Sequence, residues 1–225
     1  MDEKKSEKKF AAPFKCPLTR CEENISSSLL LSHFMKVHHH EDNGVDLKEI
    51  QEKEKISLIA SINEENLQID RVVCLGILAY RNDEKAEGGI ARSTMKKHSN
   101  ALLSKQHEFY ETHLPILIMA SRGNYVKMYA SNNEFIDPQA NFLTIWLLMP
   151  EIMETKLVAT VTVYNEELTR SLSSLIYVRK ANDTQNARDF MRTEMNCLTI
   201  NSGFLEQISN EDRIFIEISI EENLL

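Results

Sequence analysis

Short apolar runs separated by turn-forming residues dominate the chain from residue 56 onward. Two of them, "ATVTVY" at 159–164 and "RIFIEISI" at 213–220, alternate apolar with other residues, as half-buried antiparallel strands do. The runs are rich in β-branched and aromatic residues and are bounded by Gly, Pro, Asn and Asp. Strands are predicted at 56–62, 71–80, 114–121, 125–131, 142–149, 156–164, 174–180, 197–201 and 213–220.

Two segments have a helical pattern, at 89–111 and at 186–195. Gly123 and Asn124 predict a turn between two of the strands, and Pro150 follows another strand. Eight or nine short strands with two helical interruptions favour an antiparallel β-sandwich.

The first 55 residues have a different composition and divide into three parts. Residues 1–12 are lysine-rich and polar, which is typical of a disordered, basic tail. Residues 13–40 contain paired cysteines and histidines, and residues 41–55 form a charged linker. The sandwich is then expected over 56–221, with an insertion at 81–113.

The stretch "CPLTRCEENISSSLLLSHFMKVH" has the ligand spacing of a zinc finger. Four residues separate Cys16 from Cys21, eleven separate Cys21 from His33, and four separate His33 from His38. Zinc takes four such ligands in a tetrahedron, so these four residues are the predicted metal site of a ββα-type finger. His39 and His40 remain alternatives to His38 as the fourth ligand.

A unit this short buries too little apolar surface to fold alone. Metal binding would then supply most of its folding free energy, on the order of 10 kcal/mol or more. Ile25 and Leu30 are expected to fill the small interior between the cysteine turn and the helix.

Several features weigh against base reading by this finger, although nucleic-acid binding stays the alternative function. The positions that would face base edges are Ser26, Leu29 and Ser32, none of which makes the bidentate contacts of Arg, Asn or Gln. One finger covers roughly three base pairs. The chain carries a net charge of −8, so its overall field does not attract phosphate.

Composition bounds the remaining classes of protein. The 225 residues are 42% hydrophobic, which is enough for a core of one or two domains. No apolar run reaches the roughly 18 residues of a membrane span, and the charged start lacks the apolar region of a secretion signal. Cys74 and Cys197 lie in strand-like runs and are expected to be buried small hydrophobes. We therefore expect a reducing compartment, the cytoplasm or the nucleus.

The finger resembles the second zinc finger of the seven-in-absentia (Siah) family of ubiquitin ligases. The spacing is the same, and so are Pro17 after the first cysteine and the ending "HFMKVH". "NFLTIWLLMPE", "LVATVTVY" and the ending "MNCLTINSGFLEQISNEDRIFIEISI" resemble the family's substrate-binding domain, a TRAF-like β-sandwich. The resemblance covers residues 14–40 and roughly 140–221, and it implies a domain that binds partner peptides and pairs with itself.

The departures from that family limit what the resemblance implies. The RING domain and the first finger are missing, and only two cysteines remain beyond Cys16 and Cys21. Ligase activity is therefore not expected, and the insertion at 81–113 leaves the residues of the peptide groove unassigned.

The common catalytic motifs are also missing from the sequence, including the phosphate-binding glycine loops, G-x-S-x-G and H-E-x-x-H. His98, His107 and His113 have spacings that do not place them on one helix face, and Ser121 and Asp137 have no base nearby in the sequence. The interpretation is a non-enzymatic, zinc-binding protein-interaction module, of adaptor or substrate-recognition type. A partner peptide would add at a sandwich edge. The expected assemblies are a homodimer or a heterodimer with a RING-containing Siah-type ligase.

Overall fold

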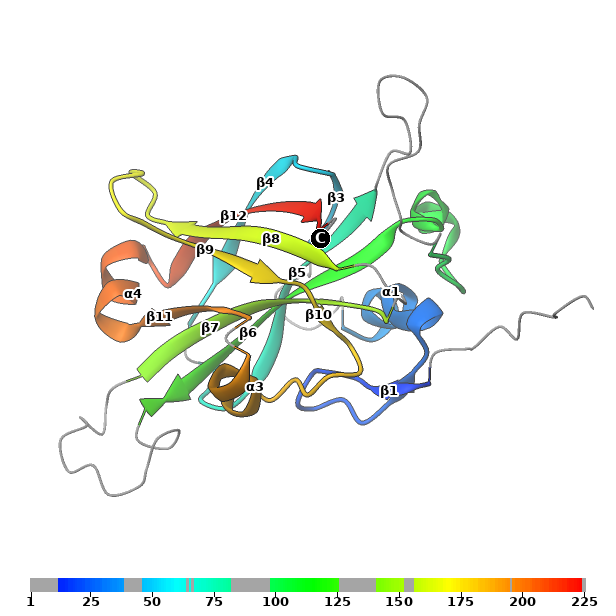
Figure 1. Cartoon of the computed structure of the whole chain (residues 1–225), viewed down its shortest axis with the longest axis horizontal. Coiled ribbons are helices and arrows are strands. Elements are labelled where there is room, and N and C mark those ends of the chain that lie inside the picture. The colour runs from blue at the N-terminus through cyan, green and yellow to red at the C-terminus, as the bar shows by residue number, and fades with distance from the viewer. Residues whose placement is uncertain are drawn as a thin grey trace, which may run out of the picture.

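The computed structural model describes residues 12–38, 46–63, 65, 67–81, 98–125, 141–151, 156–194 and 196–223. Within these ranges the chain is mainly β, with two packed sheets, a small hairpin and a few short helices (Figure 1). The expected fold class, a β-sandwich with a small, partly helical N-terminal segment, is confirmed. The TRAF-like character of that sandwich stays a prediction.

The N-terminal finger comprises β1 (Phe14–Lys15), β2 (Asn24–Ile25), a 3-10 turn η1 (Ser27–Leu29), α1 (Leu30–His33) and a π-helical turn η2 (Phe34–His38). β1 and β2 pair as an antiparallel hairpin, with Phe14 opposite Ile25. The expected strand–strand–helix order is therefore present.

The larger sheet has the strand order β10-β7-β6-β5-β3, and β11 also pairs with β7. Its strands are β3 (Leu47–Gln51), β5 (Val72–Arg81), β6 (Leu114–Asn124), β7 (Asn141–Met149), β10 (Arg179–Lys180) and β11 (Leu198–Asn201). The β5–β6, β6–β7 and β7–β11 pairs are antiparallel, whereas β3 and β10 pair in parallel with β5 and β7.

The smaller sheet is fully antiparallel and has the order β4-β12-β8-β9. Its strands are β4 (Lys55–Ser61), β8 (Leu157–Tyr164), β9 (Ser171–Tyr177) and β12 (Arg213–Glu222). Outside the finger, the described ranges contain the helical elements η3 (Lys105–Tyr110), α3 (Ala187–Thr193) and α4 (Ser202–Ile208). No helix in the described ranges is long and apolar enough to cross a membrane.

The main core lies between the two sheets and explains the alternating strands. In β12, Ile214, Ile216, Ile218 and Ile220 point into this core, while the residues between them are more exposed. A strand with one covered face requires this period of two.

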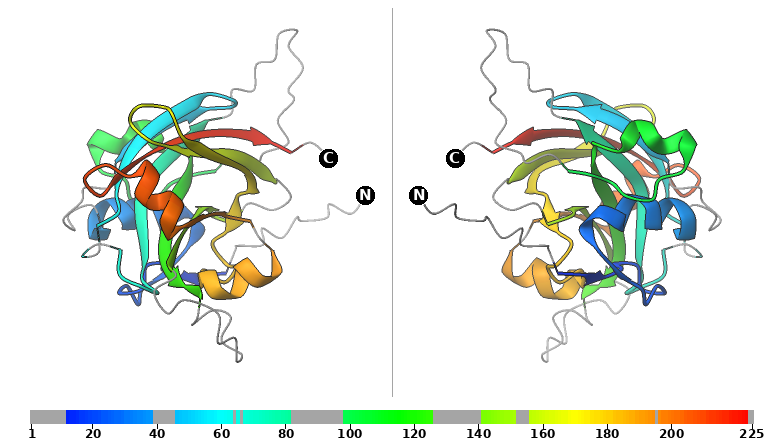
Figure 2. Two further views of the ribbon diagram at one scale, coloured as in Figure 1. Left: turned by 90° about the vertical axis from the view of Figure 1, so that its left-hand side faces the viewer. Right: turned by 90° about the vertical axis from the view of Figure 1, so that its right-hand side faces the viewer.

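A second buried cluster covers the opposite face of the larger sheet. Trp146 and Leu148 of β7 face this cluster, whereas Ile145 and Leu147 face the main core. Because both faces are covered, β7 is apolar at almost every position and its burial does not alternate. The second cover consists of the finger and α3, which lie on the side of the larger sheet away from β12 (Figure 2).

The segment at 41–55, which the sequence predicts to be a linker, contains a strand of the larger sheet. Residues 47–51 form β3, which pairs in parallel with β5. Ile50 is fully buried in the main core, although charged neighbours make the segment look like a linker. The sheet therefore begins inside that segment.

The predicted turn at Gly123 and Asn124 is wrong, because both residues belong to β6 and pair with Phe142 and Asn141. The Phe142 ring lies against Gly123, where an added Cβ would come within 2.2 Å of Cζ of that ring. Glycine is needed here for close approach and not for a turn.

The predicted helix at 186–195 is present as α3, but residues 98–104, inside the predicted helix 89–111, are not helical. In the described part of that segment the helix is reduced to η3. The predictions for residues 1–11, for residues 82–97 of the insertion and for residues 126–131 of the strand at 125–131 lie outside the described residues.

Replacing Leu147 by alanine should destabilise the sandwich by about 2–5 kcal/mol, because it opens a cavity in the main core. Leu147 is fully buried. The measurement is urea unfolding, with Ile59→Ala as the control because Ile59 is 57% exposed. Equal losses of stability in the two variants would contradict the assigned core.

Candidate metal centre

The four predicted ligands come together in one buried cluster. Cys16 follows β1 and Cys21 precedes β2, while His33 ends α1 and His38 ends η2. All four side chains are buried, and their ligand atoms lie within 4.8 Å of one another. No other such group of His, Cys, Asp and Glu side chains occurs in the ranges given above.

The distances between these atoms fit a tetrahedral ion. Sγ of Cys16 lies 3.6 Å from Nε2 of His38, and Sγ of Cys21 lies 3.6 Å from Nε2 of His33. The two Nε2 atoms are 3.0 Å apart. With zinc–sulfur bonds of about 2.3 Å and zinc–nitrogen bonds of about 2.0 Å, a tetrahedron separates sulfur from nitrogen by about 3.5 Å and the two nitrogens by about 3.3 Å. The arrangement can therefore hold a metal ion.

The backbone between the cysteines positions both sulfurs. The backbone N–H of Cys16 donates to the carbonyl oxygen of Glu23 at 2.8 Å, and the N–H of Cys21 donates to that of Leu18 at 3.0 Å. These two hydrogen bonds close the turn, so both thiols face the helix.

The π-helical turn explains how two histidines five positions apart share one face. In an α-helix, residues 33 and 38 would diverge by about 140° around the axis, since each residue turns by about 100°. The π-helical turn over Phe34–His38 is wider, with an i→i+5 repeat, so residue 38 comes back to the same side of the helix as residue 33. His33 and His38 therefore both direct Nε2 into the cluster.

A carboxylate stands behind one ligand. Oε2 of Glu23 lies 3.2 Å from Nδ1 of His33, on the side of the ring opposite Nε2. Such a partner fixes the tautomer of a metal-binding histidine and makes its other nitrogen a better ligand. The sequence interpretation missed Glu23, because its distance from His33 depends on the packing of hairpin against helix.

Burial shifts the pKa of two of the ligands, Cys16 and His33. It raises the pKa of the Cys16 thiol to about 12, with the neighbouring Cys21 adding to the rise. It lowers the pKa of His33, although Glu23 acts in the opposite direction. The neutral imidazole is already the form that binds metal, whereas the thiol needs a cation to ionise in this environment.

Packing against the rest of the chain limits the access of a nucleic acid to the predicted base-reading positions of the finger helix. Ser32 is buried and its hydroxyl donates to the carbonyl oxygen of Leu29. Leu29 packs against the second cluster, and the carbonyl oxygen of Ser28 accepts the backbone N–H of Ala101. The helix face that would enter a groove is thus directed partly at the protein itself.

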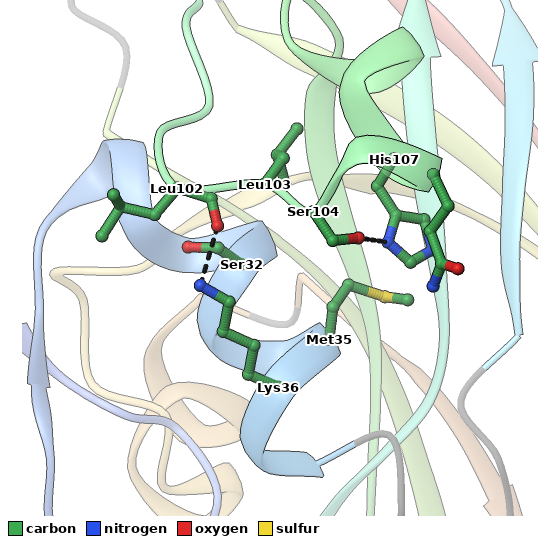
Figure 3. Close-up of a pocket in the computed structure, with 8 residues that line it drawn as sticks. Ser32, Met35, Lys36, Leu102, Leu103, Ser104 and His107 are labelled. Carbon is green, nitrogen blue, oxygen red and sulfur yellow. Dashed lines mark hydrogen bonds between the residues drawn. The ribbon is translucent and has the colours of Figure 1, made fainter.

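A pocket of about 380 Å³ lies between the finger helix and residues 102–107 (Figure 3). Lys36 Nζ donates to the carbonyl oxygen of Leu102 at 2.8 Å, and Ser104 Oγ lies 2.9 Å from Nδ1 of His107. Among the described residues, the lining includes one lysine and one histidine but no carboxylate or thiol. The described lining therefore contains no cluster of metal ligands and no carboxylate for acid–base pairing.

The other candidate residues are not part of the metal cluster. Cys74 and Cys197 are partly buried against the second cluster, and burial raises the pKa of each thiol, to about 12 for Cys74. These environments disfavour the reactive thiolate. Ser121 is buried, and its hydroxyl donates to the carbonyl oxygen of Arg122. Asp137, His39 and His40 lie outside the described residues.

The three histidines of the predicted insertion have separate partners. His98 contacts Asn100 and His107 contacts Ser104, whereas His113 is buried with Nε2 3.3 Å from Oε1 of Glu49. They form no metal cluster within the part of the chain that is described.

Comparison with known families finds a match that spans most of the chain. The family model described as a domain of unknown function, DUF4729, matches residues 15–211. The match begins next to Cys16 and includes the finger and most of the sandwich. No curated protein matches the sequence.

We expect one zinc ion per chain, because the described ranges contain a single group of four buried ligands at tetrahedral distances. Metal analysis of reconstituted protein should give a ratio near one, and Cys16→Ser should lose stoichiometric zinc. A Cys16→Ser variant that keeps the full amount of zinc would show that the ligand set is wrong.

Glu23→Gln should weaken zinc binding about tenfold or more, because the amide is a weaker partner for Nδ1 of His33 than the carboxylate is. The measurement is a competition titration against a chromophoric chelator. Glu22→Gln is the matched control, since Glu22 is the exposed neighbour of Glu23 and contacts none of the ligands in the described structure. An unchanged affinity in Glu23→Gln would show that Glu23 does not orient the ligand.

Proposed function

The chain belongs to the family described as a domain of unknown function, DUF4729, and we propose that it is a zinc-braced protein-interaction domain with no catalytic activity of its own. The supporting observation is the position of the metal cluster. Its four ligands are all buried protein side chains, which is the arrangement of a structural and not a catalytic zinc site. The residues around it share one buried cluster with Trp146 and Phe190 of the sandwich.

The brace acts by covering an apolar sheet face. Phe14, Leu30 and Phe34 of the finger are buried in the same cluster as Leu117 and Trp146 of the larger sheet. Each large apolar side chain contributes about 1.5–3 kcal/mol when buried. Zinc holds together a segment too short to keep its own fold, and that segment then shields this face from water.

The interaction role rests on the sandwich. We propose that a partner peptide binds by adding a strand at an open sheet edge, as an adaptor or substrate-recognition domain would use it. The order of a Cys2His2 finger followed by a two-sheet sandwich supports kinship with the RING-less part of Siah-type ligases. On this proposal the chain pairs with itself or with a RING-containing ligase of that type, and it transfers no ubiquitin alone.

Two further observations support this proposal over nucleic-acid binding. The charge of −8 opposes phosphate, and Ser32, a would-be base-reading residue, is buried. None of the four cysteines forms a disulfide, which supports our proposal of a reducing compartment, the cytoplasm or the nucleus.

Selection of random displayed peptides on the zinc-loaded chain should enrich sequences that bind the purified protein, with apolar residues at alternate positions. Binding should fall when a chelator removes zinc, because the larger sheet loses its cover. The control is generic duplex DNA, for which no salt-dependent binding is expected.

The same chain should form no ubiquitin conjugates when it is incubated with activating enzyme, conjugating enzymes, ubiquitin and ATP. Conjugates formed without an added RING protein would overturn the adaptor role. Failure to enrich any peptide, together with steeply salt-dependent DNA binding, would favour the nucleic-acid alternative.

A further inference from the structure

The pocket between the zinc finger and the segment that precedes β6 has no part in the proposed function. It has a volume of about 380 Å³, and none of its described lining residues belongs to a strand (Figure 3). Small-molecule sites in proteins have volumes of about 300–1,000 Å³, with apolar walls and a few polar groups. The pocket is therefore large enough for a small ligand.

The lining comes from two parts of the chain. On one side, Met35 and Lys36 belong to the turn η2 and lie between the metal ligands His33 and His38 in the sequence. The other side is formed by residues from the segment 102–107. A ligand in the pocket would therefore contact the metal-binding finger and the rest of the chain at the same time.

The charge of the lining favours an anion with a single charge. Lys36 is exposed, and its Nζ donates to the carbonyl oxygen of Leu102 at 2.8 Å. An ammonium group has three donors, so others remain for a ligand. The described lining contains no carboxylate to balance this cation, in a chain whose net charge is −8. A carboxylate on the ligand would supply that balance, whereas a phosphate usually requires more donors than one lysine.

The remaining walls favour an apolar body on the ligand. Met35 and Leu103 are partly buried and pack against the second buried cluster. Beyond them, Ser104 Oγ lies 2.9 Å from Nδ1 of His107, and no described residue forms a hydrogen bond with Nε2 of that ring. Figure 3 shows Met35 between Lys36 and His107. The pocket thus has an apolar centre between two polar sides.

The backbone at Leu102 supports a binding role for this wall. Leu102 has a φ of 57°, in the left-handed region that leucine rarely adopts, and its side chain is 69% exposed. Its carbonyl oxygen is the group that accepts the hydrogen bond of Lys36. Residues held in such conformations cluster at ligand clamps and active sites, where neighbouring contacts maintain them. This observation is independent of the charge of the pocket.

We propose that the pocket binds a small apolar monocarboxylate, with the carboxylate at Lys36 and the apolar body along Met35 and Leu103. The inference goes beyond the proposed function, because this site uses no strand edge and no peptide. Since the lining joins the finger helix to residues 102–107, a bound ligand also stabilises the finger in its metal-binding form. Coupling of this kind is reciprocal, so the ligand strengthens zinc binding and zinc strengthens ligand binding.

The test is a calorimetric titration of the full zinc-loaded chain with straight-chain carboxylates from butanoate to decanoate, with phenylacetate and with indole-3-acetate. Each carboxylate is compared with its neutral amide. At least one carboxylate should form a saturable one-to-one complex and bind about tenfold or more tightly than its amide, because the amide forms no ion pair with Lys36. Inorganic phosphate should bind more weakly, since it has no apolar body.

Two variants test the two walls separately. Lys36→Met should abolish the preference for the carboxylate over its amide, whereas Lys36→Arg should keep most of it. Leu102→Gly relieves the left-handed strain and so should keep the fold, but it should weaken the carboxylate and the amide alike because it removes an apolar wall. Lys15→Met is the matched control, since Lys15 is an exposed lysine of the finger outside the described lining.

Zinc retention provides a second measurement. With the ligand at about ten times its dissociation constant, a competition titration against a chromophoric chelator should show up to about tenfold tighter zinc binding. The neutral amide at the same concentration should give no such change, and Lys36→Met should lose it. A change that persists in Lys36→Met would overturn the coupling.

Several results would overturn the binding site itself. These are the absence of binding by every carboxylate of the set, equal affinities for carboxylates and amides, tighter binding of phosphate, and equal affinities in Lys36→Met and Lys15→Met. If no carboxylate binds and Lys36→Met instead abolishes the binding of selected peptides, the pocket is a peptide site. Peptide selection on the same chain tests the proposed function separately.

Discussion

Burial of the larger sheet on both faces is the constraint on which the rest of this structure depends. One face packs on the smaller sheet, and the other carries apolar side chains such as Trp146 and Leu148 that water would otherwise reach. An apolar sheet face left open is an aggregation hazard, so it must have a cover. The finger and α3 form that cover, and the role of the metal cluster follows from this need.

The finger uses a small number of contacts to do two things. Its four metal ligands come from the hairpin and the helix and hold these two parts together. Its apolar residues pack in the same buried cluster as residues of the larger sheet. Lys36 and Ser28 also tie the helix to residues 101–102 by hydrogen bonds. A finger held in this way has little of its helix left for a nucleic-acid groove. This arrangement favours the interaction domain over the nucleic-acid reader.

The two borders of the smaller sheet show how sequence-level charge affects assembly. β4 has a lysine of its own and receives Lys48 from the neighbouring β3, whereas β9 has neither charge nor proline. Charged side chains and proline are among the groups that keep an exposed edge from pairing with another strand. The same molecule can therefore protect one border and leave the other for a partner.

The sequence by itself determined the strands with a clear period, the residues of the metal cluster and the mainly β class, because these follow from local spacing. The alternation in "RIFIEISI" predicts β12. The intervals between cysteines and histidines indicate the metal cluster of Cys16, Cys21, His33 and His38. Tertiary structure alone decided that residues 47–51 join the sheet, that Gly123 accommodates a ring and that Glu23 stands behind His33. Each of these depends on a contact between segments that are distant in the sequence, or on the packing of the finger hairpin against its helix. Such contacts leave no periodic signal in the chain.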